Sequence, residues 1–268
     1  MTGESAVGMV DRPCVYPPVP AIPVWVIRSR ALHARAGKYG QRYGDLPRGR
    51  QELRHNRGPP PGLRHLAPHP PTRNAQVSRA QVTSILANTA ARETLREALV
   101  ATYVWGKGKS ASPGGSGPAT LHKLLAADDL LDEALDDAVT VLSRHGAVAS
   151  YEGLRGRIPG LGPSFFTKFL YFAGKTIKPA NGPAPLVLDR VLARRMRSLA
   201  SQVGRETGHD PGGSIAAWVW RDHDWSPHRY QVYLSFLHAA AHQAASTDGW
   251  PSDASPDLLE YALFNAAW

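Results

Sequence analysis

Two glycines enclose a single apolar residue near the middle of the chain, and a proline follows them directly. Gly160 and Gly162 flank Leu161, and Pro163 comes next. Glycine adopts the positive φ of a tight turn and lets another group approach the backbone closely. Proline is favoured in the first turn of a helix. Because apolar residues at helical spacing stand on both sides, the pattern predicts a helix, a hairpin and a second helix over residues 151–174.

The start of the second helix is suited to binding an anion. The first N–H groups of a helix have no partner within it, and the helix dipole places positive potential there. The residues interpreted as a phosphate site in contact with DNA are Arg157, Gly160, Leu161, Gly162 and Ser164, with Arg155 adding charge nearby. An ordinary helix-turn-helix connection in a helical bundle is the alternative.

Lys168 lies in the second helix, in a run that is apolar on nearly every side (FFTKFLYF, residues 165–172). We expect such a helix to be buried. Burial disfavours the charged form of lysine, lowers its pKa and frees the amine to act as a nucleophile. The alternative is that the long side chain extends from the helix into solvent.

One carboxylate, Asp189, follows the apolar run 186–188 and precedes a helical pattern. An aspartate in that position is an ordinary N-cap. The loop 175–190 that contains it is rich in glycine and proline. The order of hairpin, lysine, loop and aspartate favours a shared functional role for Lys168 and Asp189.

These residues resemble those of the helix-hairpin-helix DNA glycosylases, and especially the 8-oxoguanine glycosylases of the archaeal type and a similar bacterial branch. The matching segments are 158–162, 166–169 and 185–189. The likeness extends over about residues 77–268. It implies an all-α fold, a double-stranded DNA partner with a flipped base, and excision of a damaged or modified base, 8-oxoguanine by default.

The same resemblance implies that Asp189 is the catalytic carboxylate, which stabilises the sugar cation or activates the attacking group. It suggests Lys168 as the Schiff-base lysine of an enzyme that also nicks the strand by β-elimination. The animal-type enzymes carry their lysine before the hairpin, where residues 151–153 contain none. In this chain Lys168 follows the hairpin, as the lysine of the archaeal type does.

A glycosylase reads its flipped base by stacking and hydrogen bonding. The candidates for stacking are Trp105, Trp225 and Tyr230, and core packing is the alternative for each. Trp105 precedes a loop rich in Gly, Ser and Lys over 106–117, which we interpret as facing DNA or lining the pocket. That loop lacks the Walker pattern for binding nucleotide phosphates.

Composition divides the chain into two parts. Residues 1–75 hold 12 of the 23 prolines and carry 12 Lys+Arg against 4 Asp+Glu, a net charge of +8. The remaining residues carry 31−12 = 19 against 22−4 = 18, a net charge of +1. We therefore predict a disordered basic tail over 1–75, which slides on DNA or is dispensable, and a helical glycosylase-like domain over 76–268.

Cysteine and apolar content set further expectations. The single cysteine, Cys14, excludes a disulfide framework and a site built on several cysteines, and no apolar run reaches membrane-spanning length. We expect no metal and no cofactor, and a monomer in a bacterial-type cytoplasm near the nucleoid.

Three functions remain open at this point: an enzyme of base-excision repair, a glycosylase directed at modified bases of phage DNA, and a helix-hairpin-helix module that binds DNA without cutting it. The nearly neutral domain also leaves open a helical interaction protein with no role on DNA. The sequence does not decide which base is excised, which base lies opposite, or whether the strand is nicked.

Overall fold

The computed structural model describes residues 50–52, 74–87, 92–107, 117–246, 250–251 and 255–265. Over these ranges the regular secondary structure is helical apart from two strands of three residues each, which confirms the predicted all-α class. The elements are β1 (Arg50–Glu52), β2 (Asn74–Gln76), α3 (Arg79–Ala87), α4 (Arg92–Lys107), α5 (Gly117–Leu125), α6 (Asp128–His145), α7 (Ala147–Leu154), α8 (Pro163–Thr176), α9 (Arg190–Thr207), α10 (Ser214–Val219), α11 (Pro227–Ala245) and α12 (Pro256–Asn265).

The two short strands were not expected from the sequence. They pair in antiparallel orientation, with Arg50 opposite Gln76. Strands this short are held by main-chain hydrogen bonds and need no alternating pattern of side chains, so periodicity does not reveal them. Most of the predicted tail over 1–75 lies outside the described residues, and the domain boundary after residue 75 stays a prediction.

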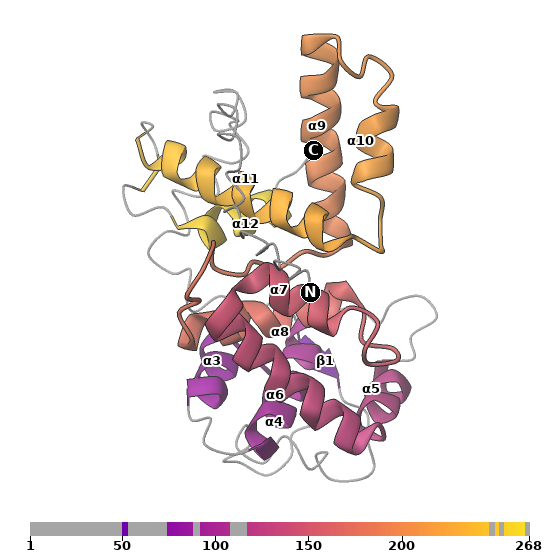
Figure 1. Cartoon of the computed structure of the whole chain (residues 1–268), viewed down its shortest axis with the longest axis vertical. Helices are drawn as coiled ribbons and strands as arrows, with labels where there is room; N and C mark the ends of the chain where they lie inside the picture. Colours follow the sequence, from indigo (N-terminus) through magenta and orange to yellow (C-terminus); the bar gives the residue numbers. More distant parts are fainter. Residues whose placement is uncertain are drawn as a thin grey trace, which may run out of the picture.

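The helices form two groups, which occupy the lower and upper halves of Figure 1. In the lower group, α8 lies at the centre and packs against α3, α4, α6 and α7. In the upper group, α12 packs against α9 and α11, and α10 packs against α9. Helix α11 also contacts α7, so one hydrophobic core extends from Val77 to Leu263 and joins both groups.

Helix α8 is buried around its circumference, as its sequence predicts. All eight residues from Phe166 to Ala173 are buried. Gly174 then allows the returning chain to cross the helix closely, because a Cβ built there would lie 2.4 Å from the Cγ of Pro185. The segment that leads to Asp189 therefore passes directly over α8.

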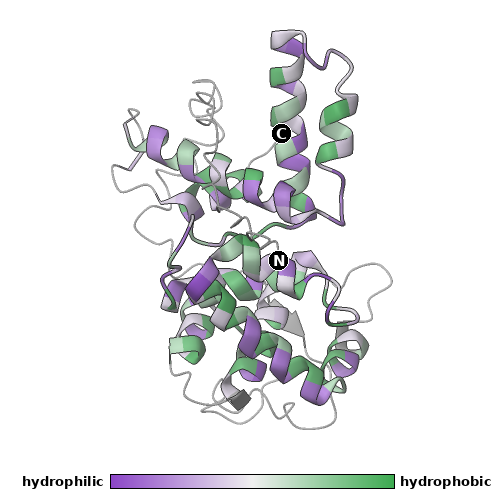
Figure 2. Cartoon of the chain, viewed as in Figure 1, coloured by the Kyte–Doolittle hydropathy of each residue, from purple (hydrophilic) through white to green (hydrophobic). Residues whose placement is uncertain are grey.

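Two helices extend beyond the ends that the sequence suggests. The helical pattern around Asp189 predicts a helix that ends at Leu199, but α9 continues to Thr207 and stops where Gly208 adopts a left-handed φ of +72°. Figure 2 shows how much of this helix is hydrophilic. Helix α4 likewise includes Gly106 and Lys107, which were predicted to lie in a loop. Apolar spacing fails to mark the end of α9 because its last three residues are exposed, whereas α4 adds only Gly106 and Lys107 after the buried Val104 and Trp105.

The described ranges contain neither a candidate membrane span nor a candidate metal site. No helix there is both long and apolar enough to cross a membrane. Within the same ranges, no group of three or more His, Cys, Asp or Glu side chains is arranged to hold a metal ion.

The close crossing at Gly174 leads to a stability prediction. We expect Gly174→Ala to lower the free energy of unfolding by about 1–3 kcal/mol, because the added methyl overlaps Pro185. The matched control is Gly153→Ala on α7, where nothing lies within 4 Å of the added Cβ. That change should stabilise the helix by roughly 0.5–1 kcal/mol. Urea denaturation measures both values, and equal destabilisation by the two variants would contradict this packing.

Candidate active site

The hairpin between α7 and α8 turns at glycine and is anchored in the core. Gly160 adopts the predicted positive φ, +87°. Gly162 is instead extended, with φ −81°, and forms the N-cap of α8, since a capping residue favours that region. Nothing lies within 4 Å of a Cβ at Gly162, so the surface beside the helix start is open. The side chain of Leu161 is buried, which holds the hairpin against the core.

Arg157 is paired with the acidic helix α6. Its Nη1 lies 2.7 Å from Asp137 Oδ2, and its Nη2 lies 3.3 Å from Glu133 Oε1. The sequence suggests a free cation beside the hairpin, but the fold places two carboxylates against it. Its predicted DNA contact would have to compete with this pairing.

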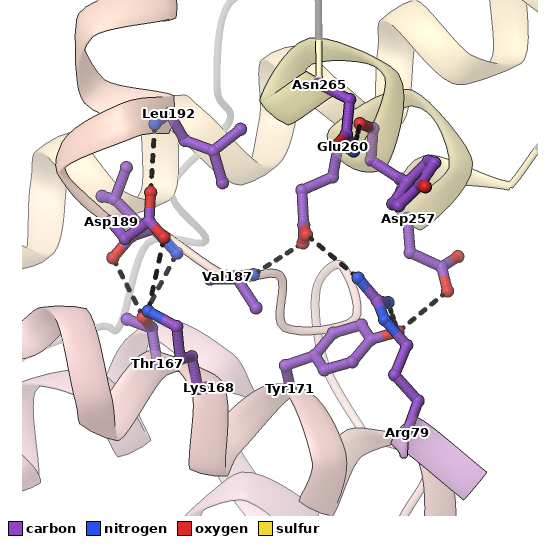
Figure 3. Close-up of polar contacts among 12 residues, drawn as sticks. Arg79, Thr167, Lys168, Tyr171, Val187, Asp189, Leu192, Asp257, Glu260 and Asn265 are labelled. Atoms are coloured by element: carbon purple, nitrogen blue, oxygen red, sulfur yellow. Dashed lines mark hydrogen bonds and ion pairs between the residues drawn. The ribbon is translucent and has the colours of Figure 1, made fainter. Parts of the chain in front are cut away.

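Lys168 lies inside the protein, with 4% of its surface exposed, so it does not extend into solvent. Its Nζ donates a hydrogen bond of 2.5 Å to the carbonyl of Ser164, one turn earlier in α8. The same Nζ lies 3.4 Å from Asp189 Oδ2. Gly106 makes room for the stem, because a Cβ there would lie 2.7 Å from Lys168 Cδ. The two residues that sequence reasoning paired thus meet in space (Figure 3).

Asp189 uses its two carboxylate oxygens for different purposes. Oδ1 accepts hydrogen bonds from the N–H groups of Val191 and Leu192 at 3.0 and 3.1 Å, which makes Asp189 the N-cap of α9. Oδ2 faces the amine of Lys168. Its side chain keeps 14% of its surface exposed, so the carboxylate lies at the edge of the core. Capping therefore fixes the direction in which the second oxygen points.

The segment before Asp189 has no helix or strand of its own, and buried side chains satisfy its main chain. The hydroxyl of Tyr230 donates to the carbonyl of Leu186 at 2.9 Å, and that of Tyr233 donates to the carbonyl of Val187 at 2.6 Å. The N–H of Val187 donates to Glu260 Oε2 at 2.9 Å. Burial raises the pKa of Tyr230 well above its ordinary value, so this phenol remains a protonated donor.

Thr167 joins this segment to α8, one residue before the lysine. Its Oγ1 lies 3.2 Å from the Leu188 nitrogen, from which it accepts a hydrogen bond, and 3.1 Å from the Leu188 carbonyl oxygen. Oγ1 also lies 2.7 Å from the carbonyl oxygen of Pro163. Because Thr167 and Leu188 directly precede Lys168 and Asp189, this contact helps to fix the distance between those two side chains.

A buried polar network supports the segment from its other side (Figure 3). Glu260 is fully buried and lies 3.8 Å from Arg79, which in turn donates a hydrogen bond to the Tyr171 hydroxyl. Tyr171 donates to Asp257 at 3.1 Å, and Lys175 lies 2.6 Å from the same carboxylate. Sequence reasoning missed Arg79 and Glu260, because charged residues so far apart show their pairing only in the folded chain.

The three aromatic residues proposed for a base pocket lie in the core. Trp225 and Tyr230 have no exposed surface, and Trp105 has 1%. Tyr230 stacks on Tyr151 with ring centroids 4.5 Å apart, and the Tyr151 hydroxyl donates to the carbonyl of Trp225 at 2.6 Å. This burial favours the alternative given above, core packing, so we assign none of the three to the site.

A different aromatic ring borders the amine. Phe165 is only partly buried, and its ring stacks on Tyr103 with centroids 4.5 Å apart. The Nζ of Lys168 lies 5.6 Å from the centroid of the Phe165 ring, and the Nζ of Lys107 lies 5.3 Å from it. Two amines therefore share one ring, although only Lys168 is buried beside a carboxylate. The rest of the predicted loop after Lys107, up to residue 116, lies outside the described residues.

This geometry can support covalent chemistry. A primary amine enclosed by apolar residues serves as a nucleophile once it is neutral. A carboxylate fixed within a few ångströms stabilises positive charge that develops on a reacting centre. At the start of α8, Pro163 has no N–H, and the N–H groups of Phe165 and Phe166 donate to the carbonyl of Gly162, so the N–H of Ser164 is the one that faces an incoming anion. An anionic ligand with an electrophilic carbon would match all three features.

Comparison with known proteins gives one family. The matching family model is described as "Putative 8-oxoguanine DNA glycosylase OGG-like protein" and covers residues 45–264, well over half of the chain. That range includes the hairpin, Lys168 and Asp189. Neither a curated protein nor a solved structure matches the chain.

The contact between the Thr167 hydroxyl and the main chain of Leu188 leads to a stability prediction. We expect Thr167→Val to lower the free energy of unfolding by about 1–3 kcal/mol, because the buried main-chain groups of Leu188 lose their partner. Thr167→Ser keeps the hydroxyl and should retain most of the stability. Thermal unfolding compares the two variants, and a valine variant as stable as the serine variant would show that the contact is dispensable.

Proposed function

Since this chain belongs to the OGG-like family of 8-oxoguanine DNA glycosylases, we propose that it excises a damaged or modified base from duplex DNA, with 8-oxoguanine as the default substrate. The observation that carries this proposal is the buried amine of Lys168, 3.4 Å from Asp189 and one turn from the start of the hairpin helix. A module that only binds DNA needs neither a desolvated lysine nor a carboxylate directed at it.

In the proposed reaction, Lys168 is the nucleophile. Its ammonium group first gives up a proton to water, and the resulting neutral amine bonds to C1′ of the target nucleotide while the bond between C1′ and the base breaks. The electron pair of that bond leaves with the base, which takes up a proton, and the attacking nitrogen loses one. Opening of the sugar ring then protonates O4′ and leaves a Schiff base between C1′ and the lysine nitrogen.

The Schiff base accounts for strand cleavage. It acidifies the C2′ hydrogen, and loss of that proton expels the 3′ phosphate by β-elimination. No external oxidant or reductant is needed. The proposal is therefore a bifunctional glycosylase and lyase, acting in base-excision repair.

Asp189 is proposed to stabilise positive charge on the sugar as the base departs. The two N–H donors at the start of α9 hold Oδ1, so Oδ2 keeps its direction throughout the reaction. Such preorganised charge stabilises a transition state without reorganisation at the moment of reaction. The open surface at Gly162 and the first turn of α8 are proposed to hold a phosphate near the flipped nucleotide.

Borohydride trapping tests the nucleophile. The chain is incubated with duplexes containing 8-oxoguanine or an abasic site and then reduced, which converts a Schiff base into a stable amine. We expect a covalent adduct with the unaltered chain and none with Lys168→Gln. The matched variant is Lys107→Gln, because its amine borders the same Phe165 ring. This variant should still form the adduct.

The other results of this experiment are equally informative. Loss of the adduct in Lys107→Gln alone would transfer the nucleophile to Lys107. Alkali-labile sites without an adduct would mean a monofunctional glycosylase in which Asp189 directs water. A further set of duplexes carries modified phage bases, and their excision without excision of 8-oxoguanine would favour a defence role over repair. Salt-dependent binding without base loss on any of these duplexes would leave only a DNA-binding module.

Substitution of the carboxylate tests the second role. Asp189→Asn keeps an oxygen that can cap α9 but removes the charge, so we expect excision to slow by about 100-fold or more. The control is Asp129→Asn, at an exposed aspartate in the first turn of α6. Single-turnover excision with saturating enzyme measures the rate. An unchanged rate in Asp189→Asn, with the fold intact by circular dichroism, would overturn the assignment.

A further inference from the structure

A cluster of arginines lies beside the site, gathered around two aspartates of the loop between α10 and α11. Asp222 lies between Arg194 and Arg197 of α9. Arg194 Nε is 3.1 Å from both carboxylate oxygens, and Arg197 Nη2 is 3.3 Å from Oδ1. Asp224 in turn pairs with two further arginines. Arg155 of the hairpin is 2.7 Å away, and Arg221 of the same loop donates to its carboxylate.

The pairing leaves a surplus of positive charge. Four guanidinium groups share two carboxylates, which gives a local charge of +2. The pKa of Asp222 is held below its ordinary value by its hydrogen bond with Arg194, and Arg190 also contributes by its charge. The pKa of Asp224 is likewise held below its ordinary value by its hydrogen bond with Arg155. Both aspartates are therefore ionised near neutral pH, and they orient the four arginines while offsetting only two of the four positive charges.

The loop that carries the two aspartates is fixed in place. Trp225 is fully buried directly after it, and its ring nitrogen donates to the carbonyl of Arg221 at 2.7 Å. Asp224 adopts a left-handed φ of +57°, which aspartate tolerates better than most residues. A loop held at both ends can present the arginine cluster in one arrangement.

The cluster is exposed and so can reach a ligand. The side chains of Arg194, Arg155 and Arg221 keep 54%, 42% and 42% of their surface exposed, and that of Arg197 keeps 33%. The hairpin's other arginine, Arg157, is instead directed toward acidic α6. Surplus positive charge beside the hairpin is therefore found on the α9 side.

From this arrangement we propose that Arg155, Arg194, Arg197 and Arg221 form a phosphate-binding surface for the DNA backbone, extending from the hairpin along α9. The surface begins next to the site, because α9 starts directly after Asp189. Guanidinium groups suit phosphate oxygens because they offer several donors in a fixed plane. This inference rests on DNA as the substrate in the proposed function, but not on base excision.

Salt-dependent binding tests the surface. Fluorescence anisotropy measures Kd for a duplex with a tetrahydrofuran abasic analogue, which cannot form a Schiff base, at several salt concentrations. Each phosphate contact adds about 0.9 to the slope of log Kd against log salt concentration. We expect Arg194→Gln/Arg197→Gln to lower that slope by about 1.8, while Arg194→Lys/Arg197→Lys, which keeps the charge, should retain most of it.

The matched control is Arg205→Gln, an exposed arginine near the far end of the same helix. Its slope should equal that of the unaltered chain. An unchanged slope in the glutamine double variant, or an equal loss in the lysine double variant, would overturn the proposal.

The two proposals fail in different ways. If the unaltered chain excises the base but the double variant has an unchanged salt slope, the arginine surface is overturned and the proposed function stays intact. If the salt slope falls in the double variant but the unaltered chain removes no base, the arginine surface is supported and the proposed function is overturned. Failure of the unaltered chain to bind duplex DNA at low salt would overturn both.

Discussion

The candidate site depends on how residues 186–188 are held between α8 and the C-terminal helices. This segment is buried but has no regular hydrogen bonding of its own, and an unpaired buried main-chain group is costly. Side chains from α8, α11 and α12 supply the partners, chiefly Thr167, Tyr230, Tyr233 and Glu260. The result is a rigid approach to Asp189, whose second oxygen then lies beside the amine of Lys168. A helix cap and an ion pair thus share one carboxylate.

Burying the lysine requires the surrounding chain to make room and to supply partners. Gly106 leaves space for its stem, Ser164 gives a carbonyl and Asp189 gives a charge. Removing an ammonium group from water is unfavourable unless such partners are present. A chain under selection for stability alone has no need of this arrangement at the end of a hairpin. Its presence is the physical reason for preferring an enzyme over a passive DNA-binding module.

Charge is divided between the two sides of the hairpin. Helix α6 carries six acidic residues and pairs with Arg157, whereas the α9 side gathers arginines around two aspartates. The overall composition hides this division because the two parts nearly cancel. A nearly neutral domain can therefore still present a basic surface to DNA, and the balance of the whole domain is a poor guide to its partners.

The sequence by itself determined the local features. Apolar spacing of 3.6 residues marked most helices, two glycines and a proline marked the hairpin, and the apolar run around Lys168 predicted its burial. The same spacing could not separate core aromatics from a base pocket, so Trp225 and Tyr230 were given a role that their burial disfavours. It also left the end of α9 short, because its exposed last turn carries no apolar stripe, and it placed Gly106 and Lys107 of α4 in a loop.

Tertiary structure decided which distant groups meet. The pairing of Lys168 with Asp189, the support from Glu260 and Arg79, and the partners of Arg157 join residues that are far apart in the chain. The spacing of apolar residues indicates which face of a helix is buried, because it depends only on residues a few positions apart in the chain. Contacts across the core depend on how helices pack, and they alone determine that one lysine is enclosed beside a carboxylate while one arginine is offset by acidic residues.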